Sequence, residues 1–184
     1  MSTADQATQL VDHVEDGSYH VDPRRTALEF RTRFMLGLIA VKGKFTKYDG
    51  TLNVDGQGNA SGELRVVTDS IETGIARRDA HLRGAWFFHS AAYPNMVFTL
   101  HRLALDSDGH LTAAGVLMIR DKQLAVATPA HLTRASDGSL ELRAEFEVDH
   151  KAAGLRWAKP GMVPGRVRVL VTIGLVRSNG AGTR

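Results

Sequence analysis

The most regular feature of this sequence is the alternation of apolar and polar residues in short segments, a pattern typical of β-strands with one buried face. Between residues 28 and 34, for example, Leu28, Phe30 and Phe34 fall on one side, and charged residues fall on the other. Together with strands near Tyr19 and Phe30, the alternation predicts strand segments at residues 41–48 with 51–54 beyond a turn, 61–68, 95–105, 110–120, 123–133, 140–148 and 166–176. The chain is therefore expected to form about eight or nine strands.

Asp-Gly pairs mark the expected turns between these strands. They occur at residues 49–50, 55–56, 108–109 and 137–138, each between alternating segments. Tight hairpin turns need backbone φ angles above zero, which glycine adopts without strain. Successive hairpins predict antiparallel strands in up-and-down order. The apolar run at residues 35–39 breaks the alternation and is expected to form a short helix or loop near one end of the sheet.

One segment, at residues 75–92, follows a different pattern and predicts a helical insertion. Ile75, Asp79, Leu82 and Trp86 recur at intervals of three and four residues, which is helical spacing. Three consecutive aromatic residues begin at Trp86, and a proline at residue 94 ends the segment before the next strand. Such an insertion is suited to covering or entering one end of a barrel.

Length and composition fit a single globular domain. The chain has 184 residues, 43% of them hydrophobic, which is enough to bury a core or enclose a cavity. We expect a polar leader at residues 1–16, an all-β domain at residues 17–177 and a flexible tail at residues 178–184. Strand spacing alone leaves a closed barrel and a two-layer sandwich open, since both bury one face of each strand.

Charge and targeting signals narrow the partners. The 23 basic and 20 acidic residues are interspersed, so no nucleic-acid-binding surface is expected. The N-terminal residues lack a basic stretch followed by an apolar run, and no later stretch approaches the roughly 20 apolar residues of a membrane span. We therefore expect a cytoplasmic protein without an integral membrane segment.

The sequence offers few groups for catalysis. Cysteine is absent, which excludes disulfides and thiolate chemistry. His81, His89 and His101 have no compact metal-ligand spacing, even together with Asp79. A Gly-x-Ser-x-Gly elbow and Gly-rich phosphate loops are also missing from the sequence. No catalytic residue, metal or cofactor is therefore expected.

Several motifs resemble those of the YceI-like family over residues 18–176. The matching residues are Tyr19, Val21-Asp22-Pro23, Leu28-Glu29-Phe30, Val41, Gly43, Phe45, Gly50, Thr73, Arg78-Asp79, His81-Leu82-Arg83, Phe87-Phe88, Tyr93-Pro94, Phe98, and the alternating Leu111, Ala113, Gly115, Leu117, Ile119-Arg120. The chain departs from the family at Phe34, where a histidine is common, and at residues 149–154, where the family has an Asp-Arg-x-x-Phe-Gly pattern.

The resemblance implies an eight-stranded antiparallel, up-and-down, lipocalin-like β-barrel that holds a polyisoprenoid or other long-chain lipid. Alternation assigns an apolar set to the interior: Phe30, Phe34, Phe45, Leu64, Val66, Phe98, Leu100, Leu117, Ile119, Leu142, Phe146, Val148, Val169, Val171 and Ile173. The expected ligand-binding residues are Phe30, Phe34, Phe45, Arg78, His81, Trp86, Phe87, Phe98, Leu100, Leu117 and Phe146. Of the two helix arginines, Arg78 is the head-group candidate, and Arg83, next to Gly84 at the expected helix end, is structural.

Two functions remain as hypotheses. The first is binding, storage or transport of a long-chain apolar lipid, with a polyisoprenoid or isoprenoid quinone implied by the resemblance. The second is an enzyme that acts on a hydrophobic small molecule in the same pocket. The expected partner is an isoprenoid or fatty-acid-like lipid, and a homodimer is a candidate assembly.

Overall fold

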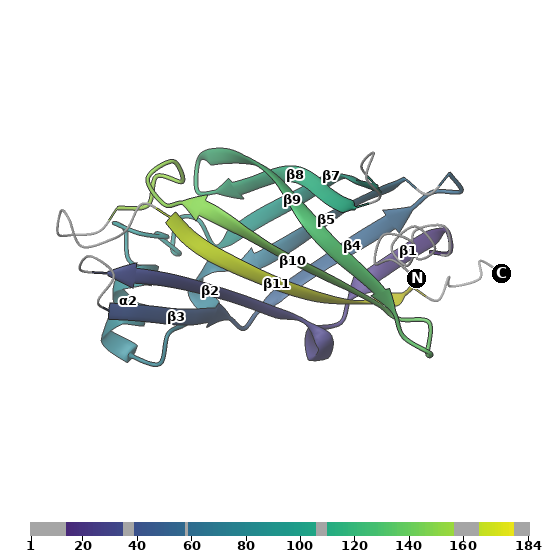
Figure 1. The fold of residues 1–184 in the computed structure, drawn as a ribbon. Helices are drawn as coiled ribbons and strands as arrows, with labels where there is room; N and C mark the ends of the chain where they lie inside the picture. The colour runs from purple at the N-terminus through teal and green to yellow at the C-terminus, as the bar shows by residue number, and fades with distance from the viewer. Residues whose placement is uncertain (1–13, 35–38, 58, 106–109, 157–165, 179–184) are drawn as a thin grey trace.

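The protein is a closed barrel of antiparallel strands with an α-helix at one end (Figure 1). The computed structural model describes residues 14–34, 39–57, 59–105, 110–156 and 166–178, without the side chains of Phe34 and Ile39. In this part of the chain, the strands are β1 (Gly17–Val21), β2 (Ala27–Phe34), β3 (Ile39–Phe45), β4 (Tyr48–Val54), β5 (Ala60–Val67), β6 (Ile71–Glu72), β7 (Asn95–Leu105), β8 (Leu111–Ile119), β9 (Lys122–Arg134), β10 (Leu140–Asp149) and β11 (Arg166–Arg177). The described helices are α2 (Ala76–Arg83) and the short 3-10 turns η1 (Pro23–Arg25) and η2 (Thr68–Ser70).

Strand β11 closes the barrel. Along one side it pairs with β10, and along the other it pairs first with β2 and then with β1. The strands β1 and β2 thus form one position in the wall, interrupted by η1, and β3 and β4 form the next. With β5 and β7 to β11, this gives eight wall positions in chain order. The predicted eight-stranded, up-and-down barrel is confirmed.

The predicted turn at Asp49 and Gly50 is wrong. Both residues lie inside β4, where Gly50 pairs with Leu64. A side chain at residue 50 would place its Cβ 2.4 Å from the carbonyl oxygen of Glu63, so this glycine permits a close strand approach. The chain instead bends at residues 46–47, whose backbone N–H groups donate to the Ser70 hydroxyl at 3.2 and 3.1 Å.

Other expectations have mixed outcomes. Turns at residues 55–56 and 137–138 are confirmed, and the 108–109 turn lies outside the described residues. The helical insertion is confirmed, although its helix covers only Ala76–Arg83 and continues as consecutive turns. The apolar run at residues 35–38 and most of the leader and tail lie outside the described residues. No helix among those described is long and apolar enough to cross a membrane.

The ladder between β9 and β10 is shorter than its neighbours. It pairs Leu140–Ala144 with residues 130–134, whereas β10 pairs with β11 along its whole length. The ladder stops beside Pro129, which has no N–H to donate. The Thr128 hydroxyl donates instead to the Glu145 carbonyl oxygen at 2.7 Å. Beyond this bond, the remaining part of β10 toward Asp149 has no described pairing with β9.

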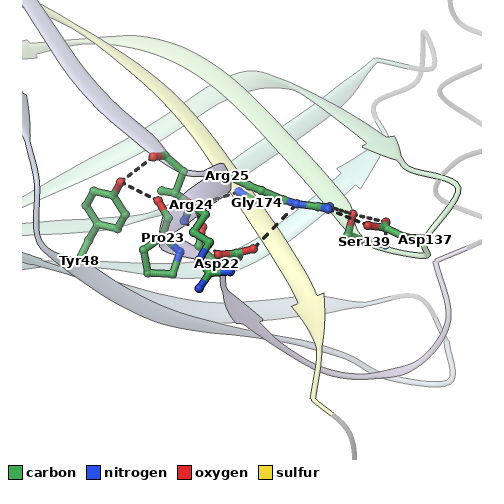
Figure 2. Close-up of polar contacts among 9 residues, drawn as sticks. Asp22, Pro23, Arg24, Arg25, Tyr48, Asp137, Ser139 and Gly174 are labelled. Atoms are coloured by element: carbon green, nitrogen blue, oxygen red, sulfur yellow. Dashed lines mark hydrogen bonds and ion pairs between the residues drawn. The ribbon is translucent and has the colours of Figure 1, made fainter.

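The junction between β1 and β2 is fixed by polar contacts around η1 (Figure 2). The Asp22 amide donates to the Gly174 carbonyl oxygen at 2.8 Å, and the Gly174 amide donates to the Thr26 hydroxyl at 3.1 Å. The Tyr48 hydroxyl donates to the Thr26 carbonyl oxygen at 2.5 Å. The turn therefore joins β11 on one side to β4 on the other.

Arg25 links the same junction to the turn between β9 and β10 (Figure 2). Its guanidinium donates to the Ser139 hydroxyl and, at 2.7 Å, to the Asp137 carboxylate. The bond from Arg25, followed by bonds from Ser139, holds the pKa of Asp137 well below its usual range. Because this pKa is lowered by folding, the contribution to stability is complete above the usual aspartate pKa and is lost as the pH falls through the lowered value.

Substitution of Gly174 tests this junction. A Cβ at residue 174 would lie 2.3 Å from the Arg25 Cβ and 3.0 Å from the Arg25 carbonyl oxygen. We expect Gly174→Ala to lower the free energy of unfolding by about 1–3 kcal/mol, because the backbone of η1 must move. Urea denaturation measures the loss. Gly56→Ala is the control, since a Cβ at residue 56 would have no heavy atom within 4 Å; equal losses would contradict the prediction.

Candidate ligand-binding cavity

The barrel encloses a cavity of about 220 Å³. One water needs roughly 10–15 Å³ by the same measure, so this space is large enough for a substantial part of an organic molecule. Its lining is almost entirely apolar and comes from both the strands and the insertion. The predicted interior set lines it, except Phe34, whose side chain lies outside the described residues: Phe30, Phe45, Leu64, Val66, Phe98, Leu100, Leu117, Ile119, Leu142, Phe146, Val148, Val169, Val171 and Ile173.

Several of these inward-facing side chains are only partly buried, which shows that they do not fill the interior. Phe30, Phe98 and Phe146 pack against the core and still retain accessible surface. Gly43 contributes to this arrangement, because the Phe30 ring lies where a side chain at residue 43 would be: an added Cβ would be 2.2 Å from it. The ring can therefore lie against the wall instead of projecting into the cavity.

The end of the barrel away from the insertion is filled by side chains, which we call the plug. There the side chains are almost completely buried and, unlike the central set, do not line the cavity: Tyr19, Val54, Ala60, Leu103, Leu111, Leu132 and Leu140. The alternation of β1 and β4 continues into this plug, so the same pattern produces a filled core at one end and a hollow at the other.

Aromatic contacts connect the insertion to the barrel wall. Phe87 and Phe88 are both buried, with ring centroids 4.9 Å apart and the rings nearly perpendicular. Phe88 contacts Phe45 of β3 at 5.7 Å, and Phe45 in turn contacts Phe30 of β2 at 6.0 Å. The pairs Phe87–Phe88 and Phe45–Phe88 are edge-to-face, a geometry that adds to the stabilisation from burial. The insertion is thus part of the cavity lining as well as its cover.

A buried carboxylate fixes the start of α2. Asp79 is 8% exposed and accepts hydrogen bonds from the Thr73 amide at 2.9 Å and from the Thr73 hydroxyl. Arg78 donates from Nε to the Thr73 hydroxyl oxygen at 2.7 Å and from Nη2 to the Thr73 carbonyl oxygen at 2.8 Å. These bonds hold Arg78 at the cavity, where it is the one arginine or lysine in the described lining.

Arg83 has the structural contacts expected of it. Its Nη2 donates to the Ile71 carbonyl oxygen at 2.8 Å, and its Nε lies 3.5 Å from the Asp69 carboxylate. The helix ends at this residue, as predicted, with the Gly84 amide donating to the His81 carbonyl oxygen. Arg83 therefore connects the end of α2 to the chain that leads into it, and it does not line the cavity.

Arg120 holds the far side of the insertion. Its Nη1 donates to the carbonyl oxygens of Phe87 at 3.1 Å and Gly154 at 3.3 Å, and its guanidinium lies 5.4 Å from the centre of the Tyr93 ring. One side chain in the tight turn between β8 and β9 thus contacts both the insertion and the loop after β10. This role of Arg120 was not expected from the sequence, which showed Arg120 only as the last residue of a predicted strand that resembles the family.

The structure brings most of the predicted ligand-binding residues together. Phe30, Phe45, Arg78, Phe87, Phe98, Leu100, Leu117 and Phe146 all line the cavity. His81 and Trp86 do not, and Trp86 is 66% exposed because the helix has ended before it and the chain turns. Outside the strands, the lining residues that were not predicted are Leu82, Phe88, His150 and Leu155. Phe88 had a signal, as the neighbour of Phe87 in an aromatic run. His150 lies in the segment 149–154 that departs from the family pattern, and Leu155 had no signal of its own.

Metal ligation has no support in the described geometry. Among residues 14–34, 39–57, 59–105, 110–156 and 166–178, no group of three or more His, Asp or Glu side chains is close enough to hold an ion. The side chains of the cavity can exclude water from an apolar molecule, and Arg78 is available to a polar group.

A closed eight-stranded barrel around an apolar cavity defines a lipocalin-like architecture. Residues 19–175 match the YceI-like domain, and the chain belongs to the YceI-like family. A UPF0312 protein of Yersinia pestis (strain Pestoides F) is 31% identical over 125 residues, covering 66% of this chain and 64% of the relative. Protein YceI of Escherichia coli O17:K52:H18 is 38% identical over 88 residues, covering 44% of this chain and 46% of the relative. The matched parts thus span less than two thirds of these relatives.

Solved structures support the same fold at low sequence identity. BcnA of Burkholderia cenocepacia has a TM-score of 0.73 at 16% identity, covering 84% of this chain and 98% of its own. A structure described as a polyisoprenoid binding domain from Saccharophagus degradans, implicated in plant cell wall breakdown, has a TM-score of 0.70 at 15% identity, covering 87% and 98%. At these identities the similarity establishes the fold.

Asp79 provides a test of how the insertion is held. Asp79→Ala should lower the free energy of unfolding by about 1–3 kcal/mol, because the partly buried Thr73 amide and hydroxyl lose their acceptor. Urea denaturation measures the change. Asp79→Asn keeps an acceptor oxygen in the same place and should lose less than half as much. Equal losses in the two variants would show that the carboxylate does not act through these hydrogen bonds.

Proposed function

We propose that this protein binds and carries a long-chain apolar lipid inside the barrel, and that the lipid is a polyisoprenoid or an isoprenoid quinone. The observation that carries the proposal is the apolar cavity inside the barrel. Its lining is apolar around the whole circumference, and inward-facing phenylalanines such as Phe98 and Phe146 keep accessible surface there. Leaving such surface empty forfeits van der Waals contacts, which a bound chain would restore.

Membership of the YceI-like family supports the choice of ligand class. One structural neighbour is described as a polyisoprenoid binding domain, and its fold covers most of this chain. An unbranched or methyl-branched chain also suits the shape, because the lining is contributed by every wall position of a barrel closed at one end. Specific hydrogen-bonding partners are few, as expected for recognition by shape and hydrophobicity.

Hydrophobic transfer alone accounts for tight retention. Each buried methylene contributes about 0.8 kcal/mol, so some 15 carbons would give roughly 12 kcal/mol before the cost of ordering the chain is subtracted. That gross value corresponds to nanomolar affinity. No chemical step is needed to keep the lipid bound.

Arg78 is our candidate for the polar end of the lipid. Only two of its five N–H donors are used in the bonds to Thr73, which leaves donors for an anionic head group such as a diphosphate or a carboxylate. The same bonds reduce the freedom of the side chain, so little further ordering is needed on binding.

The enzyme hypothesis has less support from the described lining. Two of its polar groups already have structural partners: Arg78 donates to Thr73, and Thr128 donates to the Glu145 carbonyl oxygen. An enzyme acting on a hydrophobic small molecule would need reactive groups that these contacts do not provide.

Mass spectrometry of an organic extract of the purified protein tests the proposal. A carrier should yield an unmodified long-chain lipid in stoichiometric amount. An empty barrel that converts an added hydrophobic substrate would instead support the enzyme. An extract without lipid, together with failure to take up an added polyisoprenoid or quinone, would overturn the proposal.

A charge in the lining should expel the lipid. We expect Phe146→Glu to reduce lipid content by at least about tenfold, because a carboxylate would be buried against the chain without a partner. Ala127→Glu is the matched control, since it adds the same charge at an exposed position on the outer wall. Circular dichroism must show that both variants are folded. Unchanged lipid content in folded Phe146→Glu would contradict the assigned position of the chain.

The head-group role of Arg78 predicts ligand-dependent effects. Arg78→Ala should weaken binding of an anionic isoprenoid by about tenfold, because a charge-assisted hydrogen bond is lost, and should leave binding of a neutral quinone almost unchanged. Titration of each ligand measures the two affinities. Arg83→Ala, as the comparison, should lower thermal stability and leave both affinities intact. Equal losses for both ligands in Arg78→Ala would refute the assignment.

A further inference from the structure

The outer surface of the insertion differs from the rest of the barrel in its side chains. Between residues 74 and 94, the exposed residues are Gly74, Ile75, Ala76, Arg77, Ala80, Ala85, Trp86, Ala91, Ala92 and Pro94. We call these residues the insertion surface. All but one are apolar or glycine, and the exception, Arg77, is cationic. Ile75 is 53% exposed and Trp86 is 66% exposed, which makes them two of the most exposed large apolar side chains in the described residues.

The exposed charged side chain of this surface is positive, and no exposed acidic side chain lies between residues 74 and 94. Every charged or imidazole side chain between residues 74 and 94 that has appreciable exposure is an arginine or a histidine, and the single acid, Asp79, is buried. Arg77 makes no ion pair or side-chain hydrogen bond to any described residue. The exposed Arg156 is brought to the same place by its backbone, whose amide donates to the Trp86 carbonyl oxygen at 3.0 Å.

The acidic residues that flank the insertion each lie beside a cation, one of them in α2 and the other in β3. Asp69 lies 3.5 Å from Arg83, and Glu72 lies 3.6 Å from Lys44. Their charges are therefore partly neutralised, although both pairs are exposed to solvent. A negatively charged surface that approached Arg77 and Arg156 would meet two cations without an ion-pair partner among the described residues.

We propose that the insertion surface docks onto a lipid bilayer and places the cavity against it. The proposal rests on the proposed function, since a docking surface is needed if the barrel exchanges a lipid with a membrane. A tryptophan and an isoleucine would enter the interfacial region, where amphipathic rings are favoured, and the arginines would contact anionic head groups.

The position of the surface supports a bilayer as the partner. The same short segment supplies Leu82, Phe87 and Phe88 to the cavity lining and Trp86 to the outside. Helix α2 lies at one end of the barrel (Figure 1), and the packed plug closes the opposite part of the interior. A lipid chain that moved between a membrane and the cavity at this end would contact apolar side chains on the outer face of the insertion. It would contact further apolar side chains on the inner face, which lines the cavity.

The composition also argues against a protein partner. Protein interfaces carry about one hydrogen bond per 100–200 Å² and a polar rim. On the insertion surface, only Arg77 and the Trp86 indole N–H have side-chain hydrogen-bonding groups. Alanines make up most of the rest. A fluid, apolar phase with anionic head groups needs no specific pairing and suits this surface better.

Vesicle sedimentation tests the docking. The probes are vesicles of phosphatidylcholine with and without added phosphatidylglycerol. Trp86→Ser should weaken partitioning onto both kinds by about tenfold, because an interfacial aromatic ring is lost. Arg77→Glu should weaken it by about thirtyfold on the anionic vesicles and hardly at all on the neutral ones.

Two control variants change similar side chains elsewhere. Met118→Ser removes an apolar side chain that is 42% exposed on the outer wall of β8, and Arg24→Glu reverses an exposed charge in η1. Both should partition like the unmodified protein. Equal losses in Met118→Ser and Trp86→Ser, or no binding of the unmodified protein to either vesicle, would overturn the proposal. So would a dimer that Trp86→Ser dissociates while vesicle binding is absent, because the surface would then be a protein interface.

Fluorescence gives a second readout. The chain has only two tryptophans, so in a Trp157→Phe background the emission reports on Trp86 alone. It should shift to shorter wavelength with vesicles and be quenched by brominated acyl chains, and the absence of both changes would overturn the docking. Organic extracts separate this outcome from the proposed function: Trp86→Ser should retain its lipid, and an unmodified protein that binds vesicles without holding any lipid would refute the carrier and not the docking.

Discussion

Closure of the barrel by β11 is the constraint on which the other features depend. This strand must satisfy two partners on one edge, β1 and β2, and the chain between them must leave the wall and return to it. Gly174 makes the departure possible, because its bare backbone accepts from Asp22, donates to Thr26 and leaves room for Arg25. Without closure, the strand edges would be exposed and the interior would not be separated from water.

A closed wall of eight strands sets an interior width that apolar side chains need not fill completely. In this protein the two ends of the interior use that width differently. Large buried side chains such as Tyr19 and Leu140 pack one end. Toward the insertion, Phe30 lies back over Gly43, and the space remains open. The insertion then supplies Phe88 to the lining, so that the hollow is bounded by two separate parts of the chain.

The sequence was sufficient to predict the strands and their inward faces, because alternation with a period of two is a local property that barrel closure preserves. Prediction from the sequence failed where glycine has two possible uses, and where a contact depends on tertiary structure. Gly50 suggested a turn, but its actual use is the close approach of β4 to Glu63. The exposure of Trp86 depends on the helix ending three residues earlier, and the contacts of Arg120 depend on a loop distant in sequence. Neither leaves a periodic signal.

The partial ladder between β9 and β10 gives the wall unequal mechanical strength around its circumference. Five residue pairs hold these strands together, compared with eight between β8 and β9 and ten between β10 and β11. A widening of the barrel would therefore begin at this seam, in the half of β10 that follows the Thr128 hydrogen bond to Glu145. The packed end would keep its pairing meanwhile, so the barrel can loosen on the side of the hollow without losing its fold.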